Sequence, residues 1–94
     1  MSTSGDRKAT LDLIEATGVV AVIRLNDAAA LRDTCDALAA GGVRALEVTM
    51  TVPGAVGLIA RLSASMPAGF AIGAGTVVDA DTARQVIDAG ARFV

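Results

Sequence analysis

Short β-branched runs alternate with helix-like segments along most of the chain. After a polar tail, Leu11, Leu13 and Ile14 recur at near-helical spacing and predict a leading helix over residues 6–16. Continuous apolar runs, the strongest of them Val-Val-Ala-Val-Ile, predict four buried strands. These strands are expected near residues 19–24, 45–50, 70–75 and 91–94.

Each interval between these strands carries the signals of a helix. Asn26 or Asp27 can cap the first helix, and Asp79 can cap the third, which Gly90 would end. Pro53 fits the first turn of the second helix, because that turn leaves an amide unpaired in any case. This order of a helix followed by β-α units predicts an α/β fold with parallel strands and right-handed crossovers.

Two junctions of the chain repeat. Residues 38–46 and 87–94 both read as a helix end, Ala-Gly, a small residue, an arginine and a strand. Strands begin about every 21 to 26 residues, a period at which eight units make a (β/α)8 barrel of about 200 residues. We therefore expect residues 1–94 to form a single partial domain with the first three to four units of such a barrel.

Composition excludes several classes of function. The formal net charge is −2 with the charges scattered, so no nucleic acid or membrane surface is an expected partner. The chain has no membrane-length apolar run and no signal-peptide pattern, which predicts a cytoplasmic location. It has no histidine and one cysteine, so we expect no metal site and no internal disulfide. Cys35 lies in a helical pattern and is expected to be a buried core thiol.

One carboxylate interrupts the apolar run of the second predicted strand. Glu47 stands in Leu-Glu-Val-Thr-Met-Thr, where a strand covered on both faces would carry apolar side chains throughout. A carboxylate removed from water costs several kcal/mol unless it is paired or hydrogen-bonded, so its presence here suggests chemistry. The alternative is a glutamate at a strand end that reaches solvent or an arginine.

Polar residues also stand at the ends of the other predicted strands. In a parallel α/β sheet, functional groups gather at the C-terminal ends of the strands, where Arg24, Glu47, Thr51 and Thr76 are expected. Together they would offer a cation for a carboxylate or phosphate, a carboxylate for proton transfer and hydroxyls for hydrogen bonding. A helix-capping role for Thr51 is equally consistent with its position ahead of the second helix.

The segment Gly73-Ala74-Gly75-Thr76 lies between a strand and a helix, as dinucleotide-binding loops do. The third glycine of that fingerprint is replaced by Val78, and no acidic residue closes a second strand at the required distance. We therefore expect no dinucleotide cofactor. The two glycines instead thin the strand end, so that a ligand or a facing side chain can approach the backbone closely.

These motifs together resemble the KDPG/KHG aldolase family over about residues 10–94. The most specific are Gly-Gly-Val-Arg-x-Leu-Glu-Val-Thr at 41–49 and Gly-Ala-Gly-Thr-Val at 73–77. The resemblance implies a class I aldolase without a cofactor. Such enzymes cleave 2-keto-3-deoxy-6-phosphogluconate or 4-hydroxy-2-oxoglutarate to pyruvate and an aldehyde, so the implied partner is a small keto acid.

The resemblance also implies roles for matching positions. Glu47 matches the glutamate that moves protons, through water, to and from the carbinolamine and enamine intermediates. Thr76, beside Gly75, matches the threonine that lines the pyruvate pocket. Some members hold the substrate carboxylate with an arginine at the position of Thr51, and others with one at the end of strand one. Arg24 fits the second pattern, which leaves the preferred keto acid open.

The family's imine-forming lysine, on strand six, has no counterpart in this sequence. Lys8 is the only lysine and matches no family position, so the chain alone is expected to be inactive. One interpretation is the N-terminal part of an aldolase, which the end inside a strand favours. The other is a stand-alone half-barrel module, structural or ligand-binding, that pairs with other copies. A homo-oligomer is expected, by the resemblance a trimer.

Overall fold

The computed structural model describes residues 4–25 and 27–94, and it confirms the α/β class. One parallel sheet has the order β1-β2-β3, made of β1 (Val20–Ile23), β2 (Ala45–Thr49) and β3 (Ala71–Gly75). The helices are α1 (Ser4–Thr17), α2 (Ala28–Ala40), α3 (Ala55–Ser65) and α4 (Ala80–Ala89). The predicted strands at 19–24, 45–50 and 70–75 thus differ from the observed ones by one residue at their ends.

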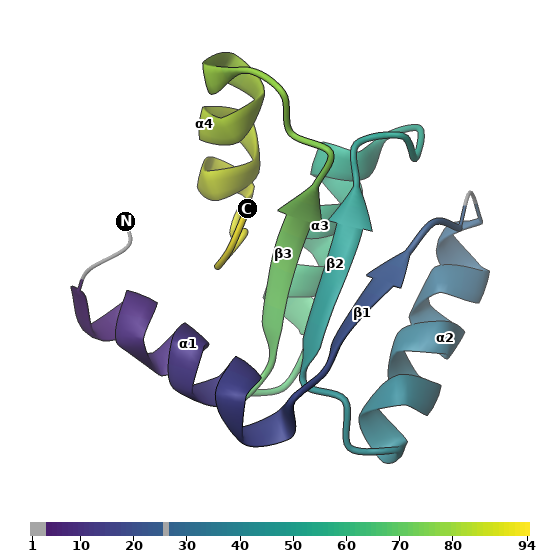
Figure 1. Cartoon of the computed structure of the whole chain (residues 1–94). Helices are drawn as coiled ribbons and strands as arrows, with labels where there is room; N and C mark the ends of the chain where they lie inside the picture. Colours follow the sequence, from purple (N-terminus) through teal and green to yellow (C-terminus); the bar gives the residue numbers. More distant parts are fainter. Residues whose placement is uncertain (1–3, 26) are drawn as a thin grey trace.

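Helices cover only one face of this sheet. In Figure 1, α3 lies behind β2 and β3, α2 stands beside β1, and α4 stands on the β3 side. The other face, turned toward the viewer, has no helix across it apart from α1, which runs below the N-terminal ends of the strands (Figure 1). We call this second face the open face.

Alternation along the strands separates a core side from the open face. Parallel register pairs Leu46 with Ile72 and Val48 with Ala74, and paired residues share a face because side chains alternate along a strand. These four side chains are at most 3% exposed, and they belong to one cluster with residues of α2, α3 and α4. The open face therefore carries the other residues, namely Val20, Val22, Ala45, Glu47, Thr49, Ala71, Gly73 and Gly75.

Cys35 lies in the core cluster, as predicted. Its side chain is fully buried on α2. Burial raises the pKa of the Cys35 thiol, and a smaller effect of the nearby Arg32 guanidinium opposes that rise. A thiol held in its neutral form is a poor nucleophile, so the residue serves the packing of α2 against the sheet.

Two of the predicted helix caps are present. The amide of Ala29 donates to Asp27 Oδ1 at 2.9 Å, so Asp27 caps α2, whereas the other candidate, Asn26, lies outside the described residues. The amide of Thr82 donates to Asp79 Oδ1 at 2.7 Å, and Gly90 ends α4 with a φ of 116°. Each cap satisfies a backbone group that the helix end leaves without a partner.

The start of α3 differs from the prediction. Pro53 lies in a turn ahead of the helix, and the N-cap is Gly54 with a φ of 71°. Two successive turns carry the chain off the sheet here, with the amide of Val52 donating to the Thr49 carbonyl and that of Ala55 to the Val52 carbonyl. Only glycine adopts such a left-handed conformation without a Cβ penalty, so the helix begins after Gly54.

The prediction of a regular strand at 91–94 is wrong. The amide of Arg92 donates to the Ile72 carbonyl at 2.8 Å, and that of Ala74 donates to the Phe93 carbonyl at 3.0 Å. A regular parallel ladder would use the carbonyl of Arg92 for the second bond, so the pairing is offset by one residue. Residues 91–94 therefore lie alongside β3 without forming a ladder.

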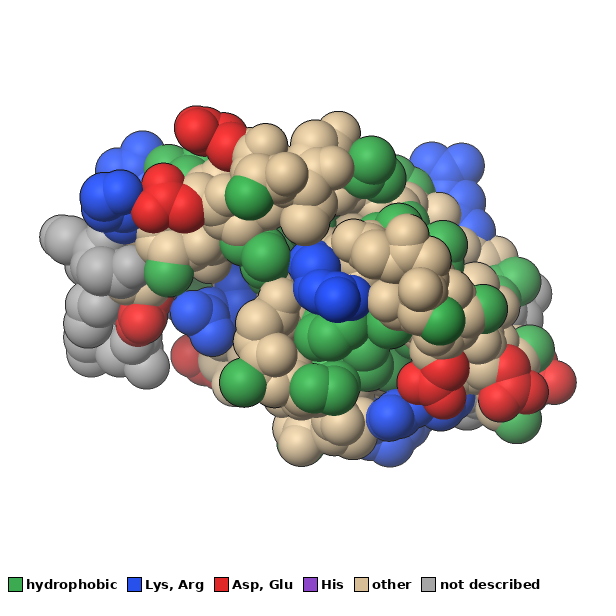
Figure 2. All heavy atoms as spheres, turned by 90° about the horizontal axis from the view of Figure 1, so that it is seen from below, with side chains coloured by type: hydrophobic (Ala, Val, Ile, Leu, Met, Phe, Trp, Pro, Cys, Tyr) green, Lys and Arg blue, Asp and Glu red, His purple; other side chains and the backbone are tan. Residues whose placement is uncertain are grey.

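The repeated arginines of the two junctions lie at the N-terminal end of the sheet. Arg44 Nη1 donates to the Ala39 carbonyl at the end of α2, at 2.9 Å, and the guanidinium lies 4.8 Å from the centre of the Phe70 ring. Arg92 lies 3.9 Å from a carboxylate oxygen of Asp6 on α1. Seen from this end, Lys or Arg side chains lie among hydrophobic ones in the middle of the molecule (Figure 2).

The cap of α4 predicts a pH dependence. Hydrogen bonds from the amide and then the hydroxyl of Thr82 lower the pKa of Asp79 below its ordinary 3.8. Near that pH the unfolded chain binds more protons than the folded one, so the stabilisation is complete above pH 3.8 and is lost as the pH falls below it. Urea unfolding should show the free energy of unfolding falling as the pH is lowered from 3.8 through the lowered pKa of Asp79. In Asp79→Asn, which keeps an uncharged cap, that part of the loss should disappear; an unchanged pH profile would contradict the assignment.

Candidate functional site

The open face has a closed end and an accessible end. At the N-terminal ends of the strands, Ala45 and Ala71 are at most 2% exposed, and Ala71 lines a hollow together with Thr10 and Leu13 of α1. Toward the C-terminal ends no helix covers the sheet, and Glu47 remains partly exposed there. The strands therefore present their only carboxylate on the accessible part of the face.

The side chain of Glu47 leans across from β2 to β3. Its carboxylate lies against the Cα of Gly75, so that a Cβ at position 75 would lie 2.7 Å from Glu47 Cδ and still closer to Oε2. The carboxylate of Glu47 forms no hydrogen bond or ion pair with the described residues. The described residues therefore do not support the alternative in which Glu47 is paired with an arginine. The carboxylate oxygens of Glu47 are left for water or a ligand.

The neighbouring glycine accommodates a different side chain. The ring of Phe93 lies against Gly73, where a Cβ would overlap three ring atoms. The prediction that these two glycines admit facing side chains is therefore confirmed at both positions. Phe93 itself was missed, although it is the only aromatic side chain in the segment that follows α4.

Two threonines meet just beyond Glu47. Thr49, the last residue of β2, is 1% exposed on the open face, and its hydroxyl lies 2.6 Å from that of Thr51. Thr51 does not cap α3, whose N-cap Gly54 makes no side-chain hydrogen bond. The capping role considered for Thr51 is therefore wrong, and its hydroxyl instead extends a polar edge at the end of β2.

Thr76 follows β3 in an unusual conformation. Its φ of 59° is the only positive value among the non-glycine residues described, and its side chain is exposed. A β-branched residue in this region is strained, and such strain is concentrated at functional sites. Thr76 immediately follows Gly75, so its hydroxyl belongs to the same end of the sheet as the Glu47 carboxylate.

The predicted cation and the lone lysine are not brought to Glu47 by any contact. Arg24 lies one residue beyond β1, exposed and without a hydrogen bond or ion pair to the described residues. Lys8 is on α1, where its Nζ lies 2.9 Å from Asp12 Oδ2 and its side chain is 76% exposed. Because α1 lies at the N-terminal ends of the strands, Lys8 is at the opposite end of the sheet from the candidate site (Figure 1).

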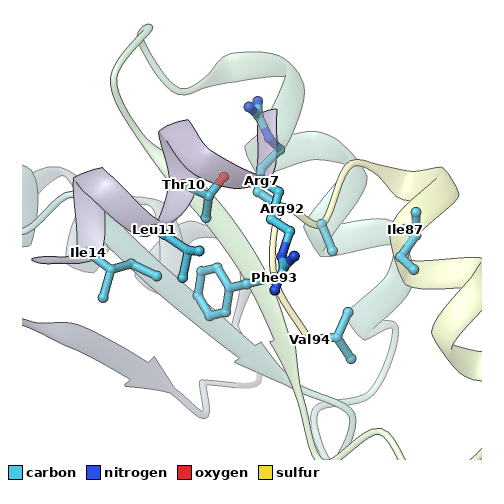
Figure 3. Close-up of a pocket in the computed structure, with 9 residues that line it drawn as sticks. Arg7, Thr10, Leu11, Ile14, Ile87, Arg92, Phe93 and Val94 are labelled. Atoms are coloured by element: carbon cyan, nitrogen blue, oxygen red, sulfur yellow. The ribbon is translucent and has the colours of Figure 1, made fainter. Parts of the chain in front are cut away.

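A cavity of about 320 Å³ lies between α1 and the segment after α4. The ring of Phe93 points toward α1, from which Leu11 and Ile14 project (Figure 3). The cavity lining is mostly apolar and includes none of Glu47, Gly75 and Thr76. It is therefore separate from the candidate site, with Phe93 between the two.

Two further features are absent from the part of the chain that the structure describes. Within residues 4–25 and 27–94, no group of three His, Cys, Asp or Glu side chains is arranged to hold a metal ion. None of the helices in these same ranges is long and apolar enough to cross a membrane.

Comparisons with known proteins agree on one family. Residues 11–94 match the sequence profile described as KDPG and KHG aldolase. The KHG/KDPG aldolase of Escherichia coli is 38% identical over 87 residues, which are 92% of this chain and 40% of that protein. A 2-dehydro-3-deoxy-phosphogluconate aldolase of Pseudomonas aeruginosa is 42% identical over 76 residues, 81% of this chain and 34% of that protein.

The fold agrees with a solved aldolase. The crystal structure of 2-keto-3-deoxy-6-phospho-gluconate aldolase from Zymomonas mobilis matches with a TM-score of 0.69 at 36% identity, covering 77% of this chain and 34% of that one. The chain thus spans between 34% and 40% of the length of these three proteins. Its three parallel strands and four helices correspond to part of an aldolase barrel. The chain belongs to the KDPG and KHG aldolase family.

Proposed function

We propose that this chain supplies the proton-transferring part of a class I aldolase that forms pyruvate and an aldehyde. Its substrate would be a 2-keto-3-deoxy sugar acid, with or without a phosphate, or 4-hydroxy-2-oxoglutarate. The observation that carries the proposal is the Glu47 carboxylate, held on the accessible part of the open face without a partner among the described residues.

The proposed role follows from the chemistry of imine catalysis. An amine condenses with the keto group, and the resulting iminium accepts the electron pair of the breaking carbon–carbon bond. A proton must reach the carbinolamine hydroxyl so that it leaves as water, and another must leave the substrate hydroxyl as the carbon–carbon bond breaks. A third must reach the enamine carbon before water releases pyruvate from the imine. A positioned carboxylate performs such transfers, directly or through one water, and typically contributes about 10²- to 10⁴-fold. Glu47 is proposed to act in this way.

The surrounding polar groups suit a keto acid. Arg24 is proposed to bind the substrate carboxylate or phosphate, because its guanidinium is exposed at the end of β1 and has no described partner. The hydroxyls of Thr51 and Thr76, with the bare backbone of Gly75, are proposed to line the pyruvate pocket. The imine-forming amine would come from outside these 94 residues, since the only lysine is on α1.

A half-barrel module that pairs with other copies remains the second candidate, and exposed apolar side chains favour it. Val19 and Val22 are 49% and 53% exposed near the β1 edge, whose backbone groups pair only on the β2 side. An unpaired strand edge of this kind is a template for association. The two candidates differ in what Glu47 does in a completed barrel, because only the aldolase proposal requires it to transfer protons. The first of the following measurements tests this difference.

Replacement of Glu47 tests its role. The experiment uses a chimaera in which residues 11–94 replace the matching segment of the Escherichia coli aldolase, so that the remainder of a barrel is present. Glu47→Gln should still form the imine with pyruvate, measured by borohydride trapping. Exchange of the pyruvate methyl protons with deuterium should fall by about 10²- to 10⁴-fold, because the proton acceptor is gone. Exchange near the level of the unsubstituted chimaera would assign proton transfer to another group.

The isolated chain should not form the imine. Lys8 is exposed, paired with Asp12 and held on α1 at the opposite end of the sheet from the candidate site, so it is not positioned to form an imine there. Borohydride treatment with pyruvate, followed by mass spectrometry, should therefore show no specific adduct on Lys8. Lys8→Arg serves as the matched background, and a saturable adduct that this substitution removes would contradict the expectation.

Association of the isolated chain should depend on the open face. Light scattering is expected to show oligomers, since burial of exposed apolar surface contributes about 25 cal/mol per Å². Val22→Glu places a charge on that face and should shift the population toward monomer. Val78→Glu is the control, because Val78 is 86% exposed in the loop before α4. A cooperative monomer without either substitution would contradict association through this face.

A further inference from the structure

We propose that Gly75 is a positioning residue for Glu47 and that Phe93 assists it, an inference that rests on the proposed function. Register places Glu47 of β2 beside Gly73, whereas the carboxylate lies against Gly75. The side chain thus leans toward the C-terminal end of β3, toward a residue two positions beyond its register partner, and two residues span about 6.6 Å of a parallel strand. Gly75 immediately precedes Thr76 in the chain.

Phe93 explains why the carboxylate does not lie beside its register partner. The space over Gly73 on the open face is filled by the Phe93 ring. Backbone hydrogen bonds on both sides hold that ring in place, from Arg92 to Ile72 and from Ala74 to Phe93. Because the ring fills the space over Gly73, the next space on the same face of β3 is the one over Gly75.

The requirement for glycine at position 75 is one of space. The positive φ values among the described glycines are at Gly18, Gly42, Gly54, Gly69 and Gly90, so the backbone of Gly75 suits any L residue. An added Cβ, by contrast, would lie 2.7 Å from Glu47 Cδ and 3.2 Å from Cγ. Alanine would therefore leave the backbone unstrained and move the carboxylate. A substitution at position 75 therefore changes where the carboxylate lies without removing it.

The consequence for the reaction is geometric. A general acid or base must lie within hydrogen-bond reach of the proton that it transfers, directly or through one water. In a parallel α/β site the reacting groups lie at the C-terminal ends of the strands, so a carboxylate over Gly75 is nearer to them than one over Gly73. A misplacement of about 1 Å can cost about 10²-fold in rate, so one methyl group is enough to matter.

The test compares two readouts in the chimaera described above. Both readouts are taken at saturating pyruvate, because a methyl at position 75 also borders the proposed pyruvate pocket. Under that condition Gly75→Ala should lower the exchange of pyruvate methyl protons by about 10²-fold while imine trapping continues, because the amine is elsewhere and the carboxylate is displaced. A role in folding alone would lower both readouts together. Gly57→Ala is the matched control, since its new Cβ would meet only Arg61 Nη1 at 3.6 Å on α3. It should change neither readout.

A second pair of variants covers the case in which Gly75→Ala folds poorly. In the isolated chain, Gly75→Ala should lower the urea midpoint, and the same substitution in a Glu47→Ala background should lower it far less, because the overlapping atoms are gone. Equal losses in the two backgrounds would overturn the inference, as would exchange unaffected by Gly75→Ala in a chimaera that Glu47→Gln disables. If Glu47→Gln itself leaves exchange intact, the proposed function fails first, so the two failures are distinguishable.

Discussion

The open face depends on two missing side chains. Gly73 and Gly75 are neighbours on one side of β3, and each leaves a space that a side chain from elsewhere fills, Phe93 in one case and Glu47 in the other. Close packing tolerates no vacant methyl-sized gaps, so a strand with two bare positions must be covered from its neighbours. Here the cover is one aromatic ring and one carboxylate. The two adjacent glycine positions thus place the apolar ring of Phe93 beside the polar carboxylate of Glu47.

The helical side of the sheet has a different task. It contains the buried aliphatic cluster and the neutral Cys35 thiol, whereas every polar residue of the proposed site lies on or beyond the other face. This division lets the core be apolar throughout while the Glu47 carboxylate stays partly exposed to solvent. A glutamate in the middle of β2 is therefore compatible with a stable strand, because the covered neighbours Leu46 and Val48 alternate with it.

Much of this arrangement could be predicted from the sequence, because it follows from local patterns. The strand cores, the Asp27 and Asp79 caps and the space made by the two glycines all depend on residues close in sequence or on period-two alternation. The misses required contacts over distance. The offset pairing at 91–94 depends on how Phe93 packs, and the direction in which Glu47 leans depends on that ring. The prediction that Pro53 lies in the first turn of α3 was wrong for a local reason, since two turns and a left-handed Gly54 intervene before that helix.

The backbone conformation of Thr76, at the C-terminal end of the sheet, reduces the stability of the fold. A β-branched residue at a φ of 59° holds a backbone conformation that glycine would adopt freely. Selection for stability alone would thus remove the hydroxyl, and redesign by backbone statistics would choose the same replacement. A version of this chain selected for thermal stability is therefore most at risk of losing the proposed role of Thr76, because replacement of Thr76 would relieve the strain in its backbone.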